Sequence, residues 1–156
     1  MSQNKLSTHA WWSMAWGLGL VPVGPGTAGT LFGVVLACFL SLMPPLYALF
    51  LLIVITCYSI YAADVFAQQL PGKDPAIIVS DEVIGFMWSV IGYPCHVSLY
   101  VCAFILFRFF DIAKPGPVRW FDSQQWGGAS IVLDDCCAGV MTWICLYILM
   151  YYHIIV

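Results

Sequence analysis

The chain has 156 residues, of which 62% are hydrophobic and 8% are charged. Soluble domains carry about 25% charged residues, so this composition excludes a soluble globule and predicts one membrane-embedded domain over residues 1–156. A net charge of −3 without a run of basic residues argues against nucleic-acid binding, and no feature of the sequence identifies a protein partner.

Four apolar regions are predicted to be helical. In chain order they are residues 31–43, 46–63, 83–107 and 136–156. Pro44 and Pro45 end the first region, because neither can donate a backbone hydrogen bond to a continuing helix, and Gly92-Tyr93-Pro94 divides the third. The fourth region is long enough to span a bilayer. This pattern predicts an all-α, polytopic membrane bundle of five helical pieces, with two short helical hairpins.

The two hairpins fix the predicted topology. With turns at both breaks, residues 1–30, 64–82 and 108–135 lie on one side of the membrane. All five Lys and Arg residues fall in these three stretches, and the positive-inside rule places them in the cytoplasm. A straight third span would instead divide the basic residues between the two sides. We therefore expect a polar site at the cytoplasmic face, a cytoplasmic N-terminus and a C-terminus on the other side.

The first polar stretch is "GLGLVPVGPGTAGTLFG", residues 17–33, which holds six glycines together with Thr27 and Thr30. Glycine permits unusual turns and exposes backbone N–H groups, so this stretch predicts a loop that cradles phosphate. The alternative is a tight turn into a closely packed helix, with Gly29 and Gly33 as a small-residue contact. The stretch lacks the GK[ST] ending of a nucleotide P-loop, which excludes nucleotide hydrolysis.

Two further stretches, "VSDEVIGF" and "VLDDCCAGV", place acidic residues at the mouths of apolar segments. Asp81 and Gly85 are four residues apart, as are Asp135 and Gly139, so each pair shares one helix face. A glycine one turn from an acid leaves room for a partner helix or a ligand. Helix capping is the structural alternative for each pair alone.

The stretch "FRFFDIAKPGPVRWFDSQQWGG" gathers three of the five basic residues between two apolar regions. Arg108 and Asp111 are three residues apart and are neighbours if the helix continues that far. We expect the helix to end at Lys114 and the chain after it to form a loop that includes Asp122.

The topology brings five carboxylates and two cations to one membrane surface. They are Asp81, Glu82, Asp111, Asp134 and Asp135, with Arg108 and Lys114. Clustered carboxylates repel one another unless they are protonated or bridged by a cation, and oxygen ligands favour Mg²⁺. Basic residues beside such an ion suit a phosphate, so this set indicates metal-assisted phosphoryl chemistry. Interfacial salt bridges are the alternative.

Two other function classes compete with an enzyme. A carboxylate-lined membrane cation transporter predicts acids deep within its spans, whereas these acids are expected at the mouths. A non-enzymatic membrane scaffold predicts no need for a clustered divalent site.

The motifs "VPVGPGTAGT", "DEVIG", "FRFFDIAKPGP" and "LDDCCAG", in this order, resemble phosphatidylglycerophosphatase A. The resemblance runs from about residue 16 to the C-terminus, with Gly116 standing where the family often carries a bulkier residue. It implies a Mg²⁺-dependent enzyme of the bacterial inner membrane that converts phosphatidylglycerophosphate to phosphatidylglycerol and inorganic phosphate.

The resemblance also implies roles for individual residues. The catalytic and metal-binding set is expected to be Asp81, Glu82, Asp111, Asp134 and Asp135. The phosphate of the phospholipid substrate is expected to contact Arg108, Lys114, Gly26, Thr27 and Thr30. The attacking group is either a water molecule or an aspartate that forms a phospho-enzyme.

Overall fold

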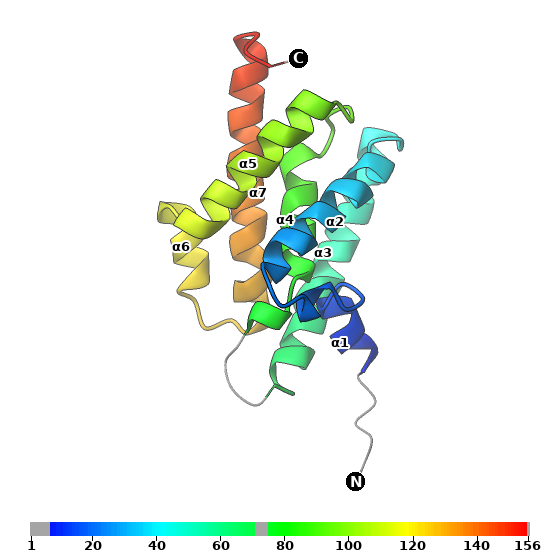
Figure 1. Ribbon diagram of the computed structural model, residues 1–156, viewed down its shortest axis with the longest axis vertical. Coiled ribbons are helices and arrows are strands. Elements are labelled where there is room, and N and C mark those ends of the chain that lie inside the picture. The colour runs from blue at the N-terminus through cyan, green and yellow to red at the C-terminus, as the bar shows by residue number, and fades with distance from the viewer. Residues whose placement is uncertain (1–6, 71–74, 156) are drawn as a thin grey trace.

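The computed structural model describes residues 7–70 and 75–155, which form a bundle of helices (Figure 1). The α-helices are α1 (Thr8–Ser13), α2 (Pro25–Leu40), α3 (Pro45–Ala67), α4 (Ser80–Val90), α5 (Val97–Ala113), α6 (Gly116–Asp122) and α7 (Gly128–Tyr151). Two short 3₁₀ turns, η1 (Leu18–Leu20) and η2 (Pro75–Ile77), precede α2 and α4. Over the described residues, the predicted all-α class and the five main helical pieces are confirmed.

Both predicted hairpin turns are present, and both lie at the upper end of the bundle in Figure 1. α2 ends at Leu40, and α3 begins at Pro45, where a proline is tolerated because a first-turn N–H has no partner within the helix. α4 ends at Val90, and Gly92 has a φ of 80°, a value that glycine adopts without strain. The chain then returns through α5.

The polar stretches lie together at the opposite, lower end of the bundle, at the starts of α2, α4 and α7 and around α6 (Figure 1). The C-terminal end of α7 lies at the upper end, away from α1. This arrangement has the form that the two hairpins predict. Lys5 and Lys73, which contributed to the predicted sidedness, lie outside the described residues.

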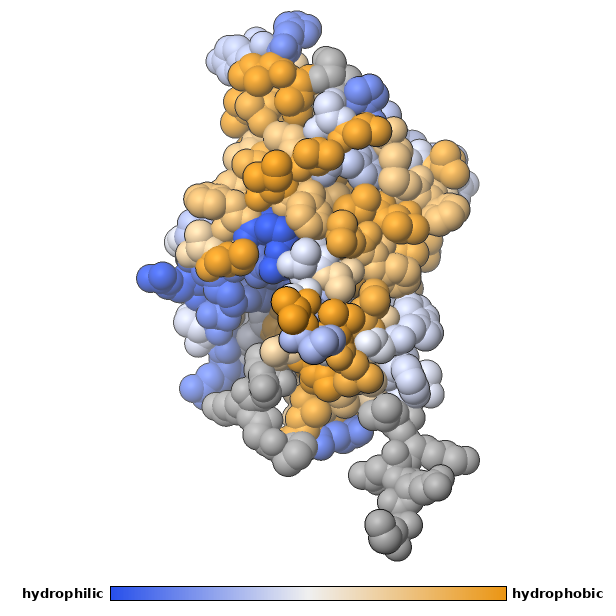
Figure 2. Space-filling view, viewed as in Figure 1, coloured by the Kyte–Doolittle hydropathy of each residue, from blue (hydrophilic) through white to orange (hydrophobic). Residues whose placement is uncertain are grey.

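The outer surface fits a membrane protein. α3 and α7, with 23 and 24 residues, are long and apolar enough to cross a bilayer. Large apolar side chains point outward, including Phe39, Phe50 and Ile105, which are each more than 60% exposed. Figure 2 shows apolar residues (orange) covering most of the upper part of the visible face. A protein surrounded by water rarely exposes so much contiguous apolar surface.

α7 begins earlier than the sequence predicts, so the acids of the fourth motif do not stand at a helix mouth. The helix starts at Gly128, and Asp134 and Asp135 lie about two turns into it. The reason is a cap from a neighbouring helix: Asp64 Oδ1 accepts the Gly128 N–H at 3.0 Å. Ser130 Oγ also accepts the Trp126 N–H at 2.9 Å, which fixes the chain just before the helix.

The predicted loop after Lys114 is wrong, because α6 occupies most of it. Lys114 does end α5, with a left-handed φ of 43°. Pro117 then falls in the first turn of α6, a position where proline suits the helix. Val118 is fully buried and anchors this short helix to the bundle.

Glycines allow α4 to lie against the backbones of its neighbours. A Cβ on Gly85 would approach the Asp135 carbonyl oxygen of α7 to 2.8 Å, and one on Gly139 would approach Trp88 Cβ of α4 to 2.9 Å. On the α2 side, a Cβ on Gly33 would lie 2.7 Å from the Val83 carbonyl oxygen. The small-residue alternative for the first motif is therefore confirmed, and the glycine beside each acid makes room for a partner helix.

Gly139→Val is accordingly expected to lower the free energy of unfolding by about 1–3 kcal/mol, the usual cost of inserting atoms into packed contacts. Thermal unfolding in detergent measures the effect. Gly116→Ala is the matched control, because a Cβ at Gly116 would meet nothing within 4 Å. Equal stability of the two variants would show that α4 and α7 are not packed through glycine.

Candidate functional site

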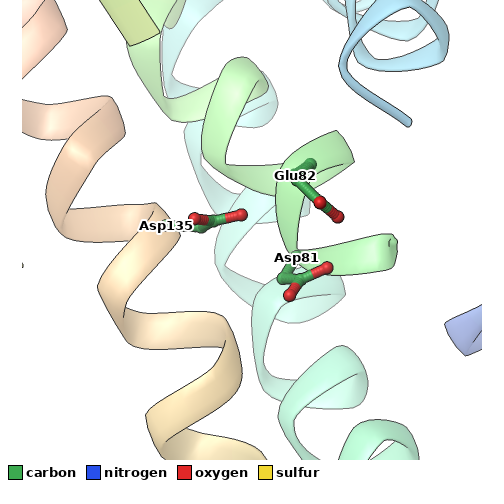
Figure 3. A group of neighbouring side chains, drawn as sticks. All are labelled: Asp81, Glu82 and Asp135. Carbon is green, nitrogen blue, oxygen red and sulfur yellow. The ribbon is translucent and has the colours of Figure 1, made fainter. Parts of the chain in front are cut away.

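Three carboxylates from two helices converge at the lower end of the bundle (Figure 3). Asp81 and Glu82 lie in the first turn of α4, and Asp135 extends toward them from α7. One oxygen from each of the three carboxylates lies within 4.8 Å of the other two. Asp135 is 3% exposed, whereas Asp81 and Glu82 are half-buried.

The cluster has unsatisfied bonding capacity. Asp81 Oδ1 and Glu82 Oε2 are buried and have no hydrogen-bond partner among the described residues. Asp111 is a further carboxylate close enough to repel both Glu82 and Asp135. Buried carboxylates of this kind are costly unless a proton or a cation compensates them. An oxygen-only set with orphaned atoms therefore fits a hard divalent cation, without fixing which one.

Arg108 connects this cluster to α2. Its Nη1 donates to Asp111 Oδ2 at 2.6 Å, the i,i+3 pair that the sequence predicts, and lies 3.4 Å from Thr30 Oγ1. Thr30 in turn donates to the Gly26 carbonyl oxygen at 2.8 Å. The guanidinium thus stands between the acids and the N-terminal turns of α2, where it has donors to offer an anion.

The part of the glycine-rich stretch that lies against the cluster is the first turn of a helix and not a loop. Pro25, Gly26 and Thr27 form the first turn of α2, after Gly24 with a left-handed φ of 63°. A Cβ on Gly26 would overlap the Glu82 carboxylate, so glycine is needed for α2 to begin this close to α4. The unpaired N–H groups of a first helical turn favour an anion nearby.

Lys114 is the centre of a second group of ion pairs beside the cluster. Its Nζ donates to Asp134 Oδ2 at 2.7 Å and to Asp122 Oδ1. Burial alone would lower the pKa of Lys114, but the hydrogen bonds to Asp122 and Asp134 outweigh it and raise that pKa above its ordinary value. Asp134 Oδ1 also accepts the Asp135 N–H at 3.0 Å. Both oxygens of Asp134 therefore have partners in the protein, unlike Asp81 Oδ1 and Glu82 Oε2.

The structure sorts the five predicted carboxylates by their partners. Asp81, Glu82 and Asp135 form the cluster, Asp111 pairs with Arg108, and Asp134 pairs with Lys114. The expectation that Asp122 lies in a loop is wrong, because it ends α6, and its carboxylate contacts Lys114. Thr27 is exposed, and its predicted contact with phosphate remains a prediction.

Comparison with known proteins assigns a family to these features. The sequence model of the family described as phosphatidylglycerophosphatase A matches residues 11–150. Phosphatidylglycerophosphatase A of Escherichia coli (strain K12) is 35% identical over 145 residues, covering 90% of this chain and 83% of that protein. The Haemophilus influenzae protein of the same name is 31% identical over 147 residues, with 90% and 87% covered.

A third relative carries a different name. A protein of Bacteroides thetaiotaomicron, named as a candidate phosphatidylinositol-3-phosphatase, is 35% identical over 136 residues, covering 82% of this chain and 84% of that protein. No solved structure matches the chain.

Proposed function

The chain belongs to the phosphatidylglycerophosphatase A family, and from this we propose that it hydrolyses phosphatidylglycerophosphate to phosphatidylglycerol and inorganic phosphate. The observation that carries the proposal is the family match over residues 11–150, which includes all four polar motifs. The buried acid cluster beside Arg108 is the chemistry that such a reaction needs. The comparisons give no support to a transporter or a scaffold.

We propose Mg²⁺ as the cofactor, held by Asp81, Glu82 and Asp135. When bound, this ion would supply Lewis-acid polarisation of the phosphate and offset the charge that develops in the reaction. The orphaned oxygens of Asp81 and Glu82 support this assignment. Asp111 and Asp134 belong to the surrounding shell, because each is already paired with a cation.

The protein's own groups would orient the substrate. Arg108 presents guanidinium donors to the phosphate oxygens, and the first-turn N–H groups of α2 around Gly26 and Thr27 add to them. Thr30 supports Arg108 from α2. Lys114 holds Asp134, and thereby the α5–α6 junction, against α7. Hydrolysis forms one P–O bond and breaks the ester P–O bond, and the glycerol oxygen leaves with a proton.

Phosphate release by purified protein tests the function. We expect release from phosphatidylglycerophosphate in mixed micelles, loss of release with a chelator, and recovery with added Mg²⁺. Phosphatidylinositol-3-phosphate serves as the comparison lipid, because one relative is named for that substrate. Faster release from that lipid would reassign the substrate, and no release from either lipid would contradict the function.

We further propose a multi-pass protein of the bacterial inner membrane with this site at the cytoplasmic face. Cysteines introduced at Asp122 and at Ile154, in a variant without the native cysteines, are expected to react with a membrane-impermeant thiol reagent from opposite sides. Labelling in intact spheroplasts and in inverted vesicles makes the measurement. Labelling of both positions from the same side would contradict the final crossing by α7.

A further inference from the structure

An apolar groove lies between α2 and α5, with a volume of about 380 Å³. Its walls include Leu31, Val34 and Cys38 from α2, and Val101, Phe104 and Ile105 from α5. Val101 and Ile105 are 55% and 62% exposed, so the groove is open to the surroundings of the bundle. Most of its walls are apolar side chains, with His96 and Tyr100 as the polar residue types among them.

The faces of α2 and α5 that line the groove lead toward the candidate site. On α5, Arg108 follows Val101 and Phe104 at the spacing of one helix face. On α2, Thr27 precedes Leu31, Val34 and Cys38 at the same spacing. Both apolar stripes therefore end in a polar residue at the same end of the groove. Figure 2 shows a hydrophilic area (blue) between α5 and α2, with apolar residues (orange) above it.

The far end of the groove is closed by the turn between α4 and α5. Cys95, in this turn, has its Sγ 2.7 Å from Cys38 Sγ of α2. The twelve residues of α5 from Val97 to Arg108 span about 16 Å at a rise of 1.5 Å per residue. This length is about half of the ~30 Å hydrocarbon core of a bilayer, which is the depth of one leaflet.

We propose that this groove binds one acyl chain of the phospholipid substrate and so places the terminal phosphate at Arg108. The assignment rests on the proposed function and names a subsite for it. Another apolar groove, of about 320 Å³, lies between α3, α4, α6 and α7 and includes Val140 and Trp88. Neither groove has an Asp, Glu, Lys or Arg in its walls. The groove between α2 and α5 differs because the apolar face of α5 that lines it leads, one turn further, to Arg108, the candidate phosphate donor.

A pair of matched substitutions tests the subsite. Val101→Trp fills the groove between α2 and α5, and Val140→Trp fills the other groove; Val140 is 43% exposed, so both side chains start near the surface. The substrates are long-chain phosphatidylglycerophosphate and its deacylated form, glycerophosphoglycerophosphate. Val101→Trp is expected to raise KM for the long-chain lipid at least about tenfold. A tenfold change corresponds to the binding free energy of about two buried methylene groups. KM for the deacylated substrate is expected to stay unchanged for both variants.

Photo-crosslinking gives a readout that does not depend on turnover. Phosphatidylglycerophosphate with a diazirine at the end of one acyl chain is expected to label α2 and α5, and Val101→Trp is expected to reduce that labelling. Excess unlabelled phosphatidylglycerophosphate should compete, whereas phosphatidylcholine should not. Ile105→Trp repeats the test if Val101→Trp does not yield folded protein.

Three results would overturn the subsite. They are an equal loss on both substrates, an equal KM rise from Val140→Trp, and labelling that phosphatidylcholine removes as well as the substrate does. The last result would mean that bulk lipid fills the groove. Wild-type protein that releases no phosphate from either substrate would instead refute the proposed function, and the subsite with it.

Discussion

Glu82→Gln is expected to reduce phosphate release from phosphatidylglycerophosphate by more than about 100-fold, because even the outer partners of metal ligands contribute 10–100-fold. The substitution keeps the size of the side chain but removes the charge that the buried cluster needs to hold a divalent cation. Among the described residues Glu82 Oε2 is buried and has no hydrogen-bond partner, so an amide nitrogen at that position breaks no hydrogen bond of the protein. Asp135→Asn is expected to behave in the same way.

The matched control is Asp64→Asn, a carboxylate at the same end of the bundle but outside the cluster. Asp64 Oδ1 accepts the Gly128 N–H, and an asparagine oxygen retains that bond. The activity of the Asp64→Asn variant should stay close to that of the wild type. Asp122→Asn would be unsuitable as a control, because Asp122 contacts Lys114.

Rates measured over a series of Mg²⁺ concentrations distinguish a variant with weakened metal binding from one that lacks the attacking group. A ligand variant should recover part of its rate as Mg²⁺ rises, whereas a variant lacking the attacking group should not. Mn²⁺ binding measured by electron paramagnetic resonance gives a second readout without substrate. If Glu82→Gln and Asp135→Asn both keep near-normal rates and Mn²⁺ binding, the cluster is not the metal site. Its acids would then serve only in interfacial salt bridges, and the metal would have to bind elsewhere.

The parts of the fold that depend on local chemistry are predictable from the sequence. Pro44 and Pro45 mark the first hairpin turn, because proline has no backbone N–H to continue a helix. Gly92 marks the second, because glycine adopts a positive φ without strain. The Arg108–Asp111 pair follows from helical spacing alone. These predictions needed no knowledge of how the helices pack.

The composition of the acid cluster is not predictable in this way. Which acids meet depends on how α4 crosses α7, and that crossing is set by the close approach of Gly85 and Gly139 to the facing backbones. α6 was missed because a seven-residue helix is marginal by itself and forms here by burying Val118 against the bundle. Without α6, nothing in the sequence brings Asp122 back to Lys114.

Arg108→Ala is expected to reduce kcat/KM for phosphatidylglycerophosphate by about 10²–10³, the typical effect of removing a donor that stabilises developing charge. Arg108 is the candidate donor nearest to both the acid cluster and the start of α2. In the substrate complex, its fork of N–H groups would replace part of the Asp111 contact by phosphate contacts. The measurement is a steady-state rate series in mixed micelles, with inhibition by inorganic phosphate recorded beside it.

A purely structural role for Arg108 makes a different prediction, because its 2.6 Å contact also neutralises Asp111. If neutralisation were its whole role, Arg108→Lys would keep the charge and restore most of the activity. A phosphate-binding guanidinium is not replaced by an ammonium, which lacks the planar fork. We therefore expect Arg108→Lys to remain at least about tenfold slower than wild type and to bind inorganic phosphate more weakly. Wild-type activity and phosphate inhibition in Arg108→Lys would assign Arg108 to charge balance and move the phosphate site toward Lys114.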